Sequence, residues 1–210
     1  MIEIKEKYSA GGHLCVIGLI METENNSLIE EMLVLAERAT RAALKFREMP
    51  EQNLNFRNHP GQWSALECLE HLNRYGEFYL PEIEKAILAQ QKKPGAHTFR
   101  SGLLGNFFAN LMRVKNGRIT KMKTPADKNP LGSPLSVTTV DRFLKQLEML
   151  KSLLHQARQI DLTRTKVPIS ISRFVRLRLG DTFRFFVYHI ERHITQANSV
   201  LEDSSHPKTN

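Results

Sequence analysis

Four long stretches of this sequence place apolar residues three or four positions apart, which is the spacing of one face of an α-helix. Helices of this kind bury their apolar faces by packing against one another. The sequence therefore predicts an all-α fold, a four-helix bundle with a long crossover between its second and third helices. The predicted helices cover about residues 27–49, 65–87, 138–157 and 181–202.

Capping-box pairs mark the starts of the first three helices. In each, a Ser or Thr is followed three positions later by an acidic residue that can bond back to the chain. The fourth helix has Asp181 as its predicted N-cap. Pro81 lies within the second helix, where its ring favours a kink. The three pairs are Ser27 with Glu30, Ser64 with Glu67, and Thr138 with Asp141.

The crossover at residues 91–136 is rich in Gly, Pro and basic side chains. A structureless loop of that length is unusual in a compact domain, so a short helix is expected at about residues 102–114. The sequence of residues 164–179 predicts an irregular or extended connection into the last helix. We expect a flexible N-terminal tail at residues 1–24, a single domain at 25–202, and a disordered C-terminal tail at 203–210.

The crossover also carries the chain's charge excess. Residues 91–128 contain nine Lys or Arg and one acid, and the whole chain has a formal charge of +8. A solvated connection is the favoured interpretation. Nucleic acid is a disfavoured partner because the basic run lacks the regular aromatic residues of a stacking platform. Two cysteines, with no apolar run of the length that spans a membrane, favour a cytoplasmic protein without a membrane partner.

The last helix contains FVYHIERHITQ, in which His189 and His193 are four positions apart on one face. The pair could bind metal or lie in the core. A zinc-protease HExxH motif is excluded because residue 190 is Ile, and no Glu-x-x-His motif of the di-iron bundles is present. His71 is the other inward histidine, on the line of Cys68 in the second helix. Three imidazoles from two helices would suit a divalent ion.

Three stretches resemble the DinB/YfiT-like superfamily of metal-binding four-helix bundles, at residues 61–83, 123–130 and 179–201. The resemblance implies a divalent metal, zinc or nickel, held by His71, His189 and His193. Gln196 would either support a ligand or form a hydrogen bond between helices. Trp63 would either line the pocket or pack as a hydrophobic staple at the start of the second helix.

Relatives in that superfamily include bacillithiol- and mycothiol-dependent transferases, and dimers are common among them. The resemblance implies an enzyme that activates a low-molecular-weight thiol, or water, for reaction with an electrophilic substrate, with homodimerisation as an option. No catalytic acid or base is identifiable. The alternatives are a non-enzymatic metal-binding stress-response module and, with less support, a nucleic-acid-binding protein. The expected basic rim of the site comprises Lys121, Lys123, Arg176 and Arg178.

Overall fold

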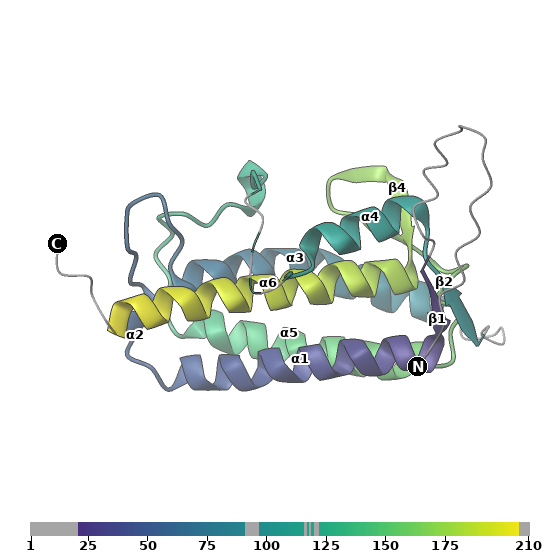
Figure 1. Cartoon of the computed structure of the whole chain (residues 1–210), viewed down its shortest axis with the longest axis horizontal. Helices are drawn as coiled ribbons and strands as arrows, with labels where there is room; N and C mark the ends of the chain where they lie inside the picture. Colours follow the sequence, from purple (N-terminus) through teal and green to yellow (C-terminus); the bar gives the residue numbers. More distant parts are fainter. Residues whose placement is uncertain (1–20, 91–96, 116, 118, 120–121, 206–210) are drawn as a thin grey trace, which may run out of the picture.

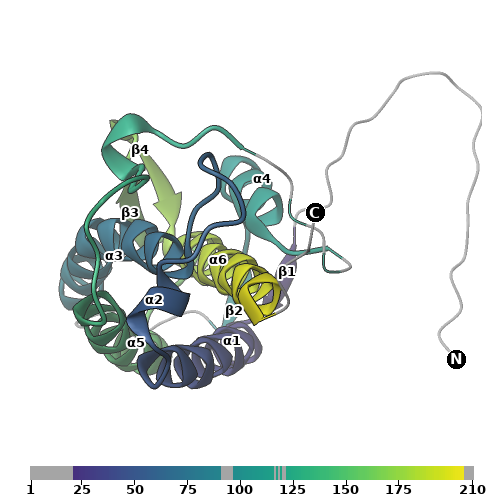
Figure 2. The ribbon, with the colours of Figure 1, turned by 90° about the vertical axis from the view of Figure 1, so that its left-hand side faces the viewer.

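The structure is a computed structural model that describes residues 21–90, 97–115, 117, 119 and 122–205. Four long helices pack side by side around one apolar core (Figures 1 and 2). Around this core α1 neighbours α5, α5 neighbours α3, α3 neighbours α6, and α6 neighbours α1. The predicted helical fold is confirmed in its class. The four helices are α1 Asn25–Arg47, α3 Ala65–Leu88, α5 Thr138–Ala157 and α6 Leu179–Ser205.

The start of α3 follows the predicted capping box. Ser64 Oγ accepts a hydrogen bond from the Glu67 amide (3.2 Å), and Glu67 Oε2 accepts one from the Ser64 amide (2.8 Å). The helix then runs through Pro81 without a break in its assignment. A helix that is fixed at its first turn presents its histidine at a defined angle to the core.

The boxes predicted for α1 and α5 do not form. The N-cap residues are Glu24 and Val137, and neither makes a side-chain capping bond. Ser27 lies inside α1, because the amide of Asn25 already donates to the carbonyl of His97 at 2.8 Å. Asp141 instead forms an ion pair with Arg47 across the α1–α5 contact, at 2.9 Å.

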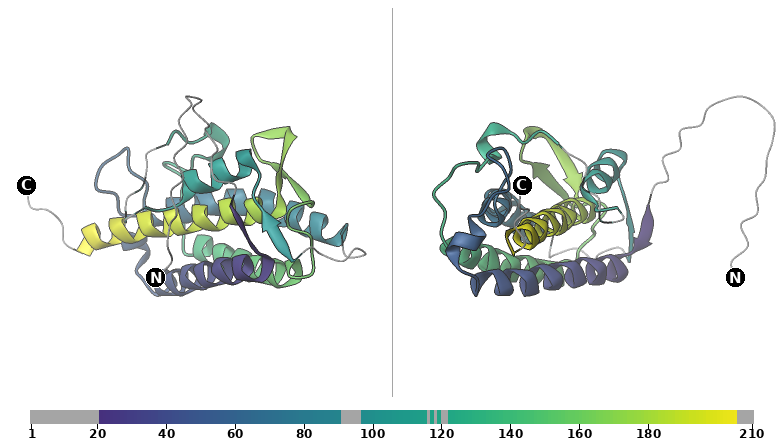
Figure 3. Two further views of the ribbon diagram at one scale, coloured as in Figure 1. Left: turned by 45° about the vertical axis from the view of Figure 1, so that its right-hand side comes forward. Right: turned by 60° about the vertical axis from the view of Figure 1, so that its left-hand side comes forward.

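The crossover contains the predicted short helix, α4 Leu103–Met112, which packs along α6 (Figure 3). It also contains strand β2 Thr98–Arg100 and a 3₁₀ turn, η1 Ala126–Lys128. Strand β2 pairs antiparallel with β1 Glu22–Glu24. The short sheet therefore ties the beginning of the crossover to the chain just before α1.

The connection at residues 164–179 is extended, which was one of the two predicted forms, and it folds into a β-hairpin. Strands β3 Lys166–Ile169 and β4 Ser172–Arg178 pair antiparallel, with Val167 opposite Leu177. Both of these side chains are buried in the core. A short helix, α2 Glu51–Leu54, completes the described elements, and none of the described helices is long and apolar enough to cross a membrane.

Asp181 is not the N-cap of α6. The helix begins two residues earlier, and the fully buried Asp181 carboxylate faces the start of α4. It accepts hydrogen bonds from Ser101 Oγ and from the Gly102 amide (2.8 Å), and it pairs with Arg184 (3.3 Å). The carboxylate therefore joins α4 to α6.

The predicted tails fall largely outside the described residues. Within the described part of the chain, residues 22–24 form β1 and residues 203–205 belong to α6. The boundaries predicted for the domain at 25–202 stay a prediction.

Candidate metal centre

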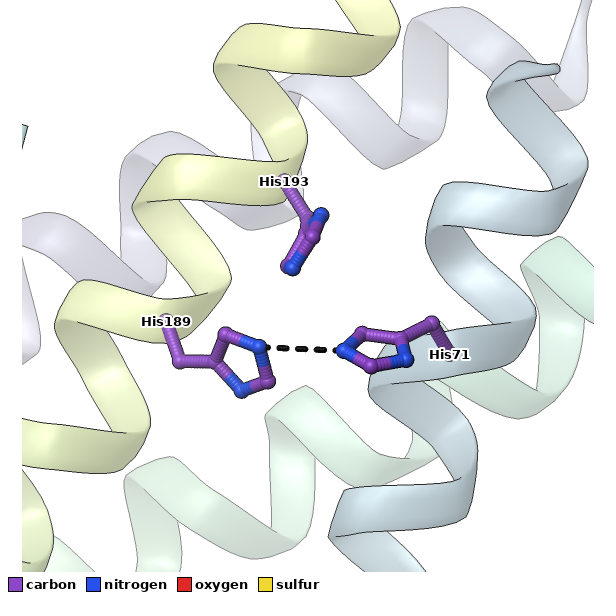
Figure 4. Close-up of side chains that lie close together, drawn as sticks. All are labelled: His71, His189 and His193. Carbon is purple, nitrogen blue, oxygen red and sulfur yellow. Dashed lines mark hydrogen bonds between the residues drawn. The ribbon is translucent and has the colours of Figure 1, made fainter. Parts of the chain in front are cut away.

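Three buried histidines converge between α3 and α6 (Figure 4). His189 and His193 lie one turn apart on α6, and His71 faces them from α3. One ring nitrogen from each lies within 4.8 Å of the others, and the Nε2 atoms of His71 and His189 are 3.1 Å apart. The structure thus brings together all three of the histidines that the resemblance implied.

Backbone contact sets the tautomer of His71. Its Nδ1 lies 2.7 Å from the carbonyl oxygen of Lys128, and a carbonyl can only accept, so Nδ1–H is the donor. In the neutral ring Nε2 then carries the lone pair, and this nitrogen faces His189. Lys128 ends η1, so the crossover supplies the group that orients a histidine of α3.

His193 is oriented in the same way by a side chain. Its Nδ1–H donates to Gln196 Oε1 at 3.0 Å, which leaves Nε2 free to accept. His189 differs, because its Nδ1 is buried and has no hydrogen-bond partner among the described residues. Groups that hold the second nitrogen of a histidine ligand usually tune metal affinity, and two of the three histidines have one here.

Burial keeps the three rings neutral. It lowers the pKa of His71 to about 4, although the bond to the Lys128 carbonyl acts in the opposite direction. Burial also lowers the pKa of His189 and of His193 well below the usual value, and the charged form of a neighbouring histidine lowers each further. Neutral imidazole is the form that binds metal, so no proton has to leave at pH 7.

The donor set fits a divalent metal ion. Two imidazole nitrogens bound to one tetrahedral zinc at about 2.0–2.1 Å would lie roughly 3.3 Å apart, close to the 3.1 Å between His71 and His189, whereas the three nitrogens together lie within 4.8 Å. Neutral imidazoles suit zinc, nickel, copper and iron alike. Three ligands would leave coordination positions open for water or substrate.

Trp63 lines the histidine cluster. Its ring lies 4.8 Å from that of His71 and 5.7 Å from that of His193, measured between centroids. Its indole Nε1–H donates to Asn129 Oδ1 at 3.1 Å, just after η1. These contacts place Trp63 in the wall of the site, whereas its packing as a hydrophobic staple stays a prediction.

Tyr75 is a wall residue that the sequence left unassigned. Its ring lies 4.9 Å from that of His71 and 4.7 Å from that of His189. Burial is the main reason that its pKa is raised to about 12, so the phenol stays protonated at neutral pH. Helical spacing places Tyr75 one turn after His71 on the same face, but it gives no sign that the ring meets α6 at the histidines. Phe185 is buried and also packs near His189.

The expected basic rim is not assembled as predicted. Arg178 ends β4 directly before α6, and His189 lies ten residues into that helix from Leu179, about 15 Å along its axis. Its guanidinium donates to the Arg100 carbonyl instead, at 2.5 Å. The cations that do act on His71 are Arg74, Lys128 and Arg192. Of the two predicted lysines, Lys123 is exposed and residue 121 lies outside the described residues.

The comparison with protein families confirms the superfamily resemblance. The model of the DinB superfamily matches residues 32–197, well over half of the 210-residue chain. The match includes all of the histidines in the cluster. No curated protein and no solved structure matches the chain significantly. The chain belongs to the DinB superfamily.

Proposed function

We propose that this protein binds a divalent metal ion, zinc or nickel, through His71, His189 and His193, and uses it to activate a low-molecular-weight thiol or water. The observation that carries the proposal is the convergence of three buried ring nitrogens from two helices within 4.8 Å. An ion at this position would supply Lewis-acid chemistry, which favours the ionised form of a thiol or of water.

The protein's own groups prepare the site for that chemistry. The Lys128 carbonyl and Gln196 fix the tautomers of two histidines. Trp63 and Tyr75 cover the cluster with aromatic surface and limit the access of water. The positive charge of Arg192 lowers the pKa of each of the three histidines. The same charge would favour an anionic reactant nearby.

The proposal extends to the whole protein: a four-helix bundle with a long crossover, in the cytoplasm, that acts on an electrophilic small molecule and forms a homodimer. The neighbour relations of the four long helices support the bundle. Cysteine usage supports the compartment. The thiol and the dimer rest on the family resemblance.

Metal analysis of the purified protein tests the site directly. We expect close to one equivalent of metal in the wild type and a loss in His71→Ala. His155→Ala is the matched control, because His155 is exposed on α5 and lies outside the cluster. A wild-type protein that stays metal-free after incubation with zinc or nickel would contradict the proposal, as would retention of metal by His71→Ala.

Turnover tests the chemistry separately. Thiol-dependent conversion of an electrophilic substrate should be measured for the wild type and for His189→Ala, with His155→Ala as the control. We expect the rate of His189→Ala to fall to the uncatalysed background. Equal rates in wild type and His189→Ala would remove the enzyme proposal and leave the metal site standing.

A non-enzymatic metal-binding module is the second candidate. It is favoured by the surroundings of the histidines, because among the described residues no carboxylate hydrogen-bonds to any of the three rings. A general acid or base is therefore not apparent. Stoichiometric metal without thiol-dependent or hydrolytic turnover would support this candidate.

The nucleic-acid alternative gains nothing from the structure. Arg100 pairs with Glu22 at 3.1 Å, and Arg113 lies over the Tyr188 ring at 5.4 Å. Lys128 is directed toward the Arg74 carbonyl at 3.3 Å. These contacts draw described basic residues of the crossover onto the protein itself. A salt titration with random DNA would show a steep loss of affinity if phosphate contacts existed.

A further inference from the structure

A hollow lies away from the histidines, between the end of α3 and the β3–β4 hairpin. Figure 2 shows the hairpin beside α3, and the hollow between them has a volume of about 300 Å³. Lys85, which lines it, follows His71 on α3 by fourteen residues, or about 21 Å along the helix axis. The hollow is therefore separate from the metal centre.

The hairpin turns a cationic face toward this hollow. Lys166 is paired with Arg178 across the two strands, and Arg176 is paired with Pro168. Side chains alternate along a strand, and Val167 between them is buried in the core. The cations at positions 166, 176 and 178 therefore share the opposite face. Like charges directly opposite one another destabilise a sheet, so this face is unfavourable by itself.

Little acidic charge offsets these cations. Glu82 is the one carboxylate among the described residues that line the hollow, against Lys85, Arg164, Lys166 and Arg176. Within the described part of the chain, Lys85, Lys166 and Arg176 form no ion pair. Arg164 has a long pair with Asp161 at 3.8 Å, and its side chain is 90% exposed.

One of the four cations has a separate explanation. Lys85 lies in the last turn of α3, where a positive charge complements the negative end of the helix dipole. That explanation does not extend to Arg164, Lys166 and Arg176, which lie on the hairpin and just before it. Burial and the charge of Arg178 also lower the pKa of Lys166, against the opposing effect of Asp181. A bound anion would offset the repulsion between these cations and would favour the charged form of Lys166.

We propose that this hollow binds a phosphate group, carried by a small phosphate ester or by a lipid headgroup. Two guanidinium groups offer the paired donors that match phosphate oxygens, and Lys166 adds a point charge. Ala86, Ala89 and Pro168 supply apolar surface for the organic part of the ligand. The volume is at the lower end of the range for small-molecule sites.

Titration with inorganic pyrophosphate tests the site. Calorimetry and amide NMR on the full chain should show saturable binding, with shifts concentrated in β3, β4 and the end of α3, at ionic strength matched with sodium chloride. In the double variant Lys166→Gln, Arg176→Gln we expect at least a tenfold loss of affinity. Lys45→Gln and Lys145→Gln, which remove exposed lysines on α1 and α5, should bind as the wild type does.

The melting temperature of the double variant shows whether weaker binding could come from unfolding. Removing two like charges from one face should leave its melting temperature unchanged or raise it, so weaker binding cannot be ascribed to unfolding. Absence of saturable pyrophosphate binding by the wild type would overturn the proposal. Equal affinity in the double variant would overturn it as well.

Vesicles distinguish the two sources of phosphate. Ile171 and Phe174 in the hairpin are 65% and 83% exposed, so the hairpin carries apolar groups that a lipid surface could contact. Sedimentation with phosphatidylglycerol vesicles, but not phosphatidylcholine vesicles, that is lost in the double variant and displaced by pyrophosphate supports a headgroup. Pyrophosphate binding without sedimentation supports a soluble phosphate ester. Sedimentation that the double variant retains would contradict a role for the hollow in lipid binding.

Discussion

Glu67 connects the first turn of α3 to two loops near the histidines. Its carboxylate is fully buried and accepts hydrogen bonds from Arg57 Nη2 (2.6 Å), from the Ser64 amide (2.8 Å) and from the Gly132 amide (2.6 Å). Gly132 follows η1 closely in the chain, and η1 ends at Lys128, whose carbonyl orients His71. The residue that completes the capping box of α3 therefore also holds the segment that positions a histidine.

We expect the buried Glu67 carboxylate to cause a specific loss of stability in acid. Burial alone would raise its pKa, but the bonds from Arg57 and from the two amides outweigh burial and hold the pKa below the usual 4.5. A carboxyl whose pKa is lowered by folding stabilises the protein above the unfolded pKa, and this contribution disappears as the pH falls through the folded pKa. The wild type should thus lose stability steeply below about pH 4.5.

Urea unfolding from pH 7 to pH 3 measures this effect. Glu67→Gln should lower the free energy of unfolding at pH 7 by about 3 kcal/mol, because a buried partner of Arg57 is lost. Its stability should also fall less than that of the wild type between pH 5 and pH 3. Glu84→Gln, at an exposed position on the same helix, is the control. Parallel pH profiles for wild type and Glu67→Gln would show that the carboxylate does not act in this way.

We expect substitution of Gln196 to change the affinity for metal rather than the stability of the fold. Gln196→Leu removes the acceptor for His193 Nδ1–H, and loss of such an outer contact typically costs 10–100-fold in affinity. Competition against a chromophoric chelator measures the change. Asn198→Leu, exposed on the same helix, should keep the wild-type affinity. Unchanged affinity in Gln196→Leu would favour the alternative in which this residue only joins helices.

At the level of elements, α4 and α6 meet at a glycine. A Cβ at Gly105 would lie 2.5 Å from Asp181 Cβ, and the bonds from Ser101 and Gly102 hold Asp181 in place. Alanine normally stabilises a helix interior relative to glycine by about 1 kcal/mol. Here Gly105→Ala should destabilise by about 2 kcal/mol, because the two helices would have to separate.

The sign of that change makes the test decisive. Thermal unfolding should give a lower melting temperature for Gly105→Ala than for the wild type. Gly61→Ala is the control, since the nearest neighbouring atom to its added Cβ would be 3.9 Å away, an ordinary contact. A higher melting temperature for Gly105→Ala would mean that α4 does not pack on α6 at this residue.

The long helices were predictable because each buries one face over many turns. The capping box of α3 was also found correctly, whereas the box at Ser27 was not, because the β1–β2 pairing holds Asn25 and starts α1 earlier. Asp141 has the right spacing for a cap, but a salt bridge to Arg47 takes its carboxylate. An extended connection was one of the alternatives predicted for residues 164–179. The pairing of β3 with β4 was not predicted, because strand β3 is only four residues long and alternation over so few positions is weak evidence.

The candidate site was also predictable only in part. His71, His189 and His193 lie on long helices whose register the apolar pattern determines, so the sequence could place them inward. The Lys128 carbonyl and Asn129 belong to the crossover, whose path depends on tertiary contacts rather than on local spacing. The interactions that orient the ligands were thus less predictable than the ligands themselves.

At the scale of the whole molecule, the three histidines join two helices that are distant in sequence. His71 and His189 are 118 positions apart, and they approach only when α3 packs on α6. A metal ion bound to all three would therefore bind the folded chain and not the unfolded one. Such a ligand stabilises by mass action, by about 2.7 kcal/mol at a free concentration of 100 times Kd.

Thermal unfolding with and without zinc or nickel measures this linkage. For a chain of this size, about 2.7 kcal/mol corresponds to a rise of roughly 5–10 °C in melting temperature. His193→Ala should lose most of the rise, because two ligands on separate helices bind far more weakly than three. His155→Ala should keep all of it, since that side chain is exposed on α5 and its ring is not part of the cluster. An equal rise in wild type and His193→Ala would place the metal elsewhere on the protein, and the cluster would then be three neutral histidines packed in the core.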